Sequence, residues 1–139
     1  MKVIFLDRDG VINKYPGDFQ YVKTWEEFKF LPRVKASLKR LSHAGFKIFV
    51  ISNQAGVSKG IYSKRTLDLI TEKMLKSLGC GVKISGVYYC THQQDENCNC
   101  RKPKTGLVEL AINNLKKEGA HILLDKSFFV GDKIGRAHV

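Results

Sequence analysis

Residues 2–10 read KVIFLDRDG, a short apolar run that ends abruptly in two acids. An apolar run of this length that is followed by polar residues predicts a buried strand, Lys2–Leu6, with Asp7 at its carboxyl end. The following turn, Asp7-Arg8-Asp9-Gly10, has two interpretations. Aspartate and glycine favour tight turns, so these residues can serve chain reversal alone. They can also place two carboxylates at the edge of a sheet, and the stretch by itself leaves both possibilities open.

Strand-like and helix-like segments alternate along the rest of the chain. We expect further strands at Lys47–Ser52, Ile84–Tyr89 and Ser127–Val130. Apolar residues at helical spacing predict helices from Pro32 to Gly45, from Ser63 to Gly79 and over Gly106–Glu118. The apolar faces of the last two helices include Leu75 and Leu110. This alternation is typical of an α/β fold with a parallel sheet covered by helices on both faces.

The whole chain has the size of one domain. Its 139 residues are expected to form a single unit, residues 1–139. No apolar stretch is long enough to cross a bilayer, and no signal peptide precedes the first strand, so we expect a cytoplasmic protein. We also expect a monomer. The net charge of +11 is either a solvated basic surface or a field that attracts anions. Because the Lys and Arg residues are scattered, a small phosphorylated metabolite fits better than nucleic acid.

Polar side chains follow each predicted strand. They are Asp7 and Asp9, then Ser52-Asn53-Gln54, then Arg101-Lys102, and finally Asp132-Lys133. Ligands of an open α/β sheet bind beyond the carboxyl ends of its strands. These groups suit phosphoryl transfer, because a carboxylate can attack phosphorus, Mg²⁺ binds carboxylates, and a hydroxyl and a lysine can hold the phosphoryl oxygens. Alternatively, Ser52-Asn53 can cap a loop and Lys102 can be a solvated charge.

The four motifs, FLDRDG, VISNQ, CRKPK and FFVGDK, resemble in order and type those of the haloacid dehalogenase-like (HAD) phosphatases. The resemblance implies a magnesium-dependent phosphomonoester hydrolase with a HAD-like Rossmannoid sheet and a minimal cap. It implies Asp7 as the nucleophile, Asp9 as general acid and base, and Ser52 and Lys102 as phosphate holders. It implies Asp7, Asp9 and Asp132 as Mg²⁺ ligands. By the same resemblance, substrate would meet Asn53, Gln54, Arg101 and Lys133.

A cysteine and histidine cluster follows the third predicted strand. Cys90, His92, Cys98 and Cys100 form a Cys₃His set whose spacing indicates a closed, structural zinc site that staples a polar loop. Chance cysteine pairs or a reversible disulfide are the alternatives, and Cys80 lies apart. This loop resembles the group that contains D-glycero-D-manno-heptose 1,7-bisphosphate phosphatase and the histidinol-phosphate phosphatase domain. The five-residue gap in this loop is shorter than in some heptose enzymes and leaves the substrate open. The stretch SNQAG followed by Val57–Tyr62 looks closer to the heptose enzymes, so we expect removal of the 7-phosphate from the heptose bisphosphate through an aspartyl-phosphate, with histidinol phosphate as the alternative substrate.

Three further expectations concern the flap, the terminus and other classes of function. The segment Asn13–Leu31 is long for a strand-to-helix connection and is expected to form a small flap over the site, with Arg8 and Lys59 as surface or flap residues. The terminal Ile134–Val139 matches the translation of a sequencing-adapter string, so we expect a non-native end on an incomplete domain. A non-catalytic zinc-stapled binding domain and a nucleic-acid 3′-phosphatase remain the competing interpretations.

Overall fold

The computed structural model describes residues 1–93, 96–100 and 105–131. Its strands are β1 (Lys2–Leu6), β2 (Phe46–Asn53), β3 (Ile84–Cys90) and β4 (Phe128–Val130). Its helices are α1 (Val34–His43), α2 (Lys64–Leu78) and α3 (Gly106–Lys117), with short 3₁₀ turns at η1 (Trp25–Glu27) and η3 (Leu124–Lys126). Every strand and helix expected from the sequence is present, with ends that differ by one or two residues.

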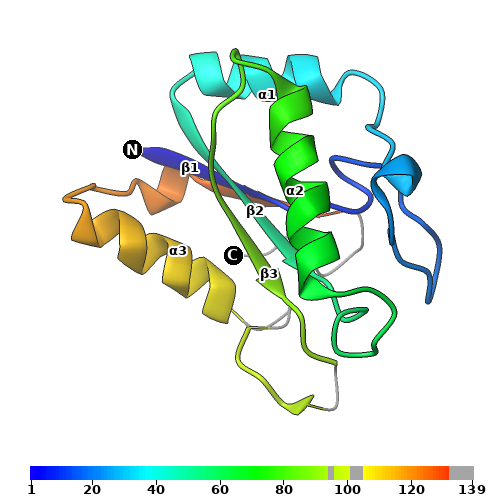
Figure 1. Cartoon of the computed structure of the whole chain (residues 1–139). Helices are drawn as coiled ribbons and strands as arrows, with labels where there is room; N and C mark the ends of the chain where they lie inside the picture. The colour runs from blue at the N-terminus through cyan, green and yellow to red at the C-terminus, as the bar shows by residue number, and fades with distance from the viewer. Residues whose placement is uncertain (94–95, 101–104, 132–139) are drawn as a thin grey trace.

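The strands form one parallel sheet in the order β3-β2-β1-β4 (Figure 1). The chain runs outward from β1 to β2 and β3 and then returns to the opposite side of β1. This reversal makes the carboxyl end of β1 a topological switch point, which is the usual place for a ligand in an open α/β sheet. The connections after β1, β2 and β3 all leave from that edge, at the lower right of Figure 1.

Helices cover both faces of the sheet, as expected. On one face Phe5 and Ile51 pack with Ala111 and Leu115 of α3. On the other face Ile48 packs with Leu38 and Leu78, and Val50 packs with Ile70 and Met74. Alternate residues of one strand therefore serve opposite cores, which is the period of two that a strand imposes.

Local sequence signals explain where α2 begins and which side it buries. The Ser63 hydroxyl accepts a hydrogen bond from the Thr66 amide, which satisfies one of the free N–H groups at the start of the helix. Leu67, Ile70, Met74 and Leu78 are buried. Leu75 and Leu110 also stand at helical spacing with the buried positions of their helices, but they are 40% and 46% exposed. Each lies at the edge of its helix's apolar face, where spacing alone does not decide burial.

The segment between β1 and α1 is a packed loop. Its two ends meet where the Lys14 amide donates to the Lys29 carbonyl at 2.8 Å, and the Leu31 amide donates to Ile12 at 2.9 Å. Inside it, the rings of Trp25, Phe28 and Phe30 pack on one another at centroid distances of 5.1–6.4 Å. We refer to residues 13–31 as the flap. No helix in the described ranges has the length and apolar character needed to cross a membrane.

Candidate active site

The turn after β1 holds Asp7 at the carboxyl edge of the sheet. Asp7 is 3% exposed, and its backbone amide donates to the Val130 carbonyl of β4 at 3.0 Å. One of its carboxylate oxygens accepts a hydrogen bond from the Arg8 amide at 2.8 Å. Gly10, with φ of 91°, then takes the left-handed conformation that lets the chain reverse. The residues thus form a tight turn and also present a carboxylate, so the two interpretations of the sequence are compatible.

Asp9 is held by three side-chain donors from separate parts of the chain. Its Oδ1 accepts from Arg8 Nε at 3.0 Å and from Asn13 Nδ2 at 2.9 Å. Its Oδ2 accepts from Gln54 Nε2 at 3.1 Å. The side chain keeps 18% of its surface exposed. Oδ1 accepts two hydrogen bonds and Oδ2 accepts one. Oδ2 is therefore the oxygen that can still accept a hydrogen bond from another group.

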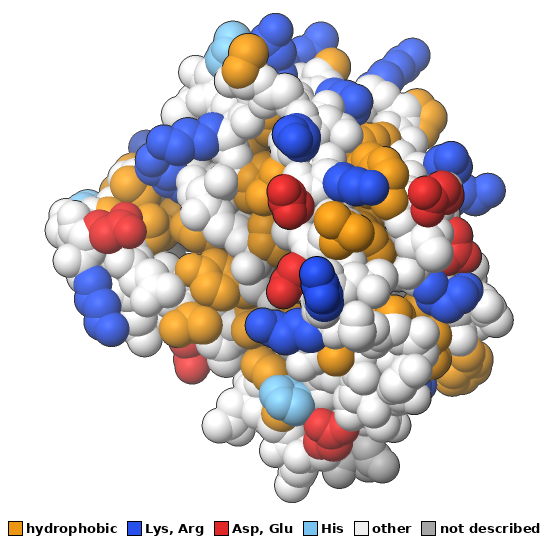
Figure 2. Space-filling view, in the orientation of Figure 1, with side chains coloured by type: hydrophobic (Ala, Val, Ile, Leu, Met, Phe, Trp, Pro, Cys, Tyr) orange, Lys and Arg blue, Asp and Glu red, His pale blue; other side chains and the backbone are white. Residues whose placement is uncertain are grey.

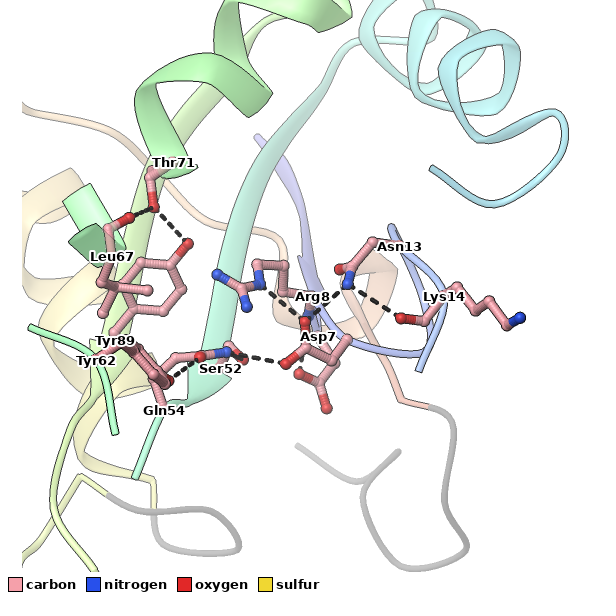
Figure 3. Close-up of polar contacts among 11 residues, drawn as sticks. Asp7, Arg8, Asn13, Lys14, Ser52, Gln54, Tyr62, Leu67, Thr71 and Tyr89 are labelled. Atoms are coloured by element: carbon pink, nitrogen blue, oxygen red, sulfur yellow. Dashed lines mark hydrogen bonds and ion pairs between the residues drawn. The ribbon is translucent and has the colours of Figure 1, made fainter. Parts of the chain in front are cut away.

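Gln54 joins Asp9 to the end of β2 (Figure 3). Its Nε2 also donates to Ser52 Oγ at 3.0 Å, and its Oε1 accepts from the Tyr62 hydroxyl at 2.6 Å. Gln54 and Ser52 are each 1% exposed. The structure therefore links Asp9 and Ser52, two residues that the sequence places 43 positions apart, through one buried amide.

Arg8 is buried, and its expected place on the surface or the flap is wrong. The side chain is 0% exposed, and the guanidinium carbon lies 5.7 Å and 5.6 Å from the ring centroids of Phe28 and Tyr89. Burial alone would lower the pKa of Arg8, but Asp9 and Tyr89 outweigh it and the pKa is raised. Within the described residues, its two terminal nitrogens have no hydrogen-bond partner. Lys59, in contrast, is exposed and bonds Tyr21 of the flap at 2.7 Å.

Some expected site residues cannot be placed. Arg101, Lys102, Asp132 and Lys133 lie outside the described residues, as does the segment 134–139. Asn53 is half-buried at the last position of β2. The structure thus brings together Asp7, Asp9, Ser52 and Gln54 of the predicted set.

Sequence reasoning missed two polar residues of the site. Asn13 is 0% exposed and bonds Asp9, and Tyr62 is 7% exposed and bonds Gln54. Neither belongs to a motif or to the residues directly after a strand. Only the folding of the loops after β1 and β2 brings them inward, so no local signal in the sequence identifies them.

The donor set at the end of β1 suits a magnesium ion. Hard oxygen ligands, one or two of them carboxylates, are what Mg²⁺ takes from proteins. The buried carboxylate of Asp7 and the backbone carbonyl of Asp9 offer such oxygens at the switch point of the sheet. Two neighbouring negative charges also repel a phosphate, and a cation between them and the phosphate removes that repulsion.

The Cys and His residues after β3 gather as expected. One ligand atom from each of Cys90, His92, Cys98 and Cys100 lies within 4.8 Å of the others. Neighbouring pairs are 2.9–3.5 Å apart. The ligands of a tetrahedral zinc–thiolate site are separated by about 3.7 Å, since Zn–S bonds are about 2.3 Å. The four groups therefore fit a closed zinc site, and all the cysteines are free thiols.

Burial opposes ionisation of these thiols unless a cation is bound. Burial and the neighbouring Cys100 raise the pKa of the Cys90 thiol to about 12, and burial also raises the pKa of Cys100. A zinc ion binds thiolates and would reverse this preference. Cys98 and Cys100 also pack against the core between the sheet and α3, so the cluster is continuous with the fold.

The loop after β2 connects the Cys/His segment with the flap. The backbone N–H of Gln54 donates to the backbone carbonyl of Cys90 at 2.7 Å. Ser58 hydrogen-bonds Gln93 and Glu96, which lie between the Cys and His residues of that segment. On its other side, this loop meets the flap through Lys59 and Tyr62, which both contact Tyr21. Three loops that follow three different strands are therefore joined beside Asp9.

Positive charge is spread over the surface. Figure 2 shows Lys and Arg side chains scattered over the visible face among hydrophobic and neutral groups, with no continuous stripe. On this face, the positive charge of a chain with net charge +11 offers a general attraction to anions and no stripe that would follow the backbone of a nucleic acid.

Comparison with known proteins identifies the family. A family model described as polynucleotide kinase 3 phosphatase matches residues 2–139. The chain is 38% identical over 134 residues to D-glycero-beta-D-manno-heptose-1,7-bisphosphate 7-phosphatase of Helicobacter pylori, covering 95% of this chain and 72% of that protein. It is also 38% identical over 136 residues to the histidine biosynthesis bifunctional protein HisB of Campylobacter jejuni, covering 95% of this chain and 36% of that protein.

A solved structure has the same fold. The crystal structure of D,D-heptose 1,7-bisphosphate phosphatase from B. bronchiseptica, complexed with magnesium and phosphate, matches with a TM-score of 0.76 at 32% identity. The match covers 86% of this chain and 65% of that one. Together with the strand-end acids and the Cys₃His cluster, these matches confirm the expected family: the chain belongs to the HAD-like phosphatases, in the group of the heptose-1,7-bisphosphate phosphatases and the HisB phosphatase.

Proposed function

We propose that the protein is a magnesium-dependent phosphatase that removes the 7-phosphate of D-glycero-D-manno-heptose 1,7-bisphosphate. The observation that carries the proposal is the meeting of Asp7, Asp9 and Ser52 at the switch point of a sheet. The substrate comes from the relatives, since heptose phosphatases match nearly the whole chain at 36–38% identity.

In the proposed reaction an oxygen of Asp7 attacks the phosphorus, and the bond from phosphorus to the sugar oxygen breaks. Asp9 gives its proton to the leaving sugar oxygen, so the products of this step are the free alcohol and an aspartyl-phosphate on Asp7. The Asp9 carboxylate then takes a proton from water, whose oxygen attacks the phosphorus. The bond between Asp7 and phosphorus breaks, inorganic phosphate leaves, and both acids return to their starting state.

The side chains around the two acids hold the transferring group. The Ser52 hydroxyl and the ammonium of Lys102 would bind phosphoryl oxygens as charge develops on them. Asp7, the backbone carbonyl of Asp9 and Asp132 would hold Mg²⁺, which neutralises charge on the phosphate. Asn53, Arg101 and Lys133 would contact the rest of the substrate.

The Cys/His cluster is proposed to bind a structural zinc ion. The close approach of Cys90, His92, Cys98 and Cys100 supports it, and four protein ligands leave no position for substrate. We further propose a cytoplasmic monomer, since the reducing cytoplasm keeps such cysteines available for a metal.

A second substrate, histidinol phosphate, is favoured by the HisB match at 38% identity over 136 residues. Phosphate release is therefore measured with heptose 1,7-bisphosphate, histidinol phosphate and a 3′-phosphorylated oligonucleotide, each with Mg²⁺ and with chelator. The assay uses the chain and the product of the whole open reading frame that encodes it.

The proposal expects the heptose ester to give the highest kcat/KM, with no release in chelator. Preference for histidinol phosphate or for the oligonucleotide would replace the proposed substrate. Absence of release from all three would instead favour the non-catalytic binding domain.

A further inference from the structure

Gln54 uses every polar atom of its side chain inside the protein. One Nε2 hydrogen goes to Asp9 Oδ2 at 3.1 Å and the other to Ser52 Oγ at 3.0 Å, while Oε1 accepts from Tyr62. A primary amide has two hydrogens to donate, so none remains for a substrate. Both donor hydrogens of this side chain are therefore used by two residues of the proposed reaction.

The amide works in only one orientation. If it were flipped, Oε1 would face the Asp9 carboxylate, and two acceptors would meet without a hydrogen between them. The Tyr62 hydroxyl donates to Oε1 at 2.6 Å and so stabilises the orientation in which Nε2 faces Asp9 and Ser52. Tyr62 therefore determines that Nε2 of Gln54, rather than Oε1, faces Asp9 and Ser52.

Tyr62 is itself fixed in place. Its ring packs directly on Gly56, where a Cβ atom would clash with the ring, and it lies 6.1 Å from the ring of Tyr21. Burial raises the pKa of the Tyr62 hydroxyl above its usual range. The group therefore remains a hydrogen-bond donor at all pH values where the protein would act.

The bond to Gln54 also determines where the Ser52 hydrogen points. Ser52 Oγ accepts from Nε2, so its own hydrogen must lie in another direction. Asp9 Oδ2 likewise keeps one acceptor direction beside the one that Gln54 uses. The proposed reaction uses both groups. The Ser52 hydroxyl can donate to a phosphoryl oxygen, and Asp9 Oδ2 can carry the proton that is transferred.

We propose that Tyr62, acting through Gln54, is a positioning residue that aims the Ser52 hydroxyl and Asp9 Oδ2 at the transferring phosphoryl group. This inference rests on the proposed phosphatase function. It assigns no contact between the substrate and Tyr62 or Gln54. Loss of the Tyr62 hydroxyl should therefore slow the chemical steps and leave substrate binding intact.

The test compares Tyr62→Phe with Tyr88→Phe by steady-state kinetics on heptose 1,7-bisphosphate. Tyr88 is a matched control, because its hydroxyl also hydrogen-bonds a side-chain amide, accepting from Asn114 Nδ2 at 3.1 Å, but on the α3 face of the sheet. We expect Tyr62→Phe to lower kcat about tenfold with KM within about twofold, as for one lost hydrogen bond. Tyr88→Phe should keep the wild-type kcat although it also loses such a bond.

A double-mutant cycle separates positioning from stability. Gln54→Met keeps the volume of the side chain and removes the amide, so Tyr62→Phe should cause no further loss of kcat in that background. Three results would each overturn this inference and leave the proposed function standing. They are a kcat of Tyr62→Phe within twofold of wild type, an equal loss of kcat in Tyr88→Phe, and additive losses of kcat in the double variant. If the wild-type protein turns over no phosphate ester, the proposed function fails and this inference fails with it.

Discussion

Arg8 carries its charge into the interior of the protein. Its guanidinium contacts the rings of Phe28 and Tyr89, and its Nε donates to Asp9. Burying a charge is unfavourable, especially where, as among the described residues, its terminal nitrogens have no hydrogen-bond partner, and an apolar side chain of similar size would cost less. What Arg8 adds is a donor that fixes Asp9 Oδ1 and a contact between the site and the flap.

We expect Arg8→Ala to lower the free energy of unfolding by about 3 kcal/mol, because it leaves a cavity beside two rings and removes a partner of Asp9. Urea unfolding measures this change. Arg40→Ala, at an exposed position of α1, should leave the unfolding midpoint near that of the wild type. Equal midpoints for the two variants would contradict the role given to Arg8.

At this scale the sequence predicts some residues and misses others for a physical reason. Asp7, Asp9 and Ser52 stand directly after strands, and the edge where parallel strands end brings them together. Arg8, within a turn of acids and glycine, is predicted at the surface. Its burial depends on Phe28 and Tyr89, which belong to distant segments, and no local pattern contains that information.

The elements are predicted better than single residues because their signals repeat. The apolar runs of β1, β2 and β3 and the Ser63 cap of α2 each place an element within a residue or two of its bounds. The loops have no period, so their packing could not be predicted. The loop after β2 shows this, since it turns Gln54 and Tyr62 inward and leaves Ser58 and Lys59 at the surface.

Gly56 tests how this loop supports the site. A Cβ at position 56 would clash with the Tyr62 ring, so Gly56→Ala should displace the ring and lower kcat by about as much as loss of the Tyr62 hydroxyl. In Gly81→Ala, the new Cβ meets only the far end of the Lys39 side chain, which can move. Gly81→Ala should keep the wild-type kcat. A similar kcat for both variants would show that the Tyr62 ring position is unimportant.

Over the whole molecule, the Cys/His cluster after β3 and helix α3 share one core. Cys90 ends β3 in the core, and Cys98 and Cys100 pack against the same core as Leu107 and Ala111 of α3. The residues that would hold the ion are therefore tied to the packing of α3 on the sheet, and losing the ion should loosen both.

We expect one zinc ion per chain by elemental analysis, and a fall in Tm of about 10 °C or more when a chelator removes it. Zinc affinity should rise with pH, because the thiols must lose protons to bind. Cys98→Ser should lose the zinc, whereas Cys80→Ser, which changes an exposed cysteine apart from the cluster, should retain it. A metal-free protein with the same Tm in chelator would contradict the zinc assignment.

Asp7 is proposed to carry the phosphoryl group during turnover. The most direct measurement is acid-quench detection of label on the protein after mixing with Mg²⁺ and a substrate whose 7-phosphate is radiolabelled. The account predicts a protein-bound acyl phosphate at Asp7 in the wild type, with neither label nor turnover in Asp7→Asn, and wild-type behaviour in Asp68→Asn, a change at an exposed position of α2. Unchanged turnover in Asp7→Asn, or label at another residue, would contradict it.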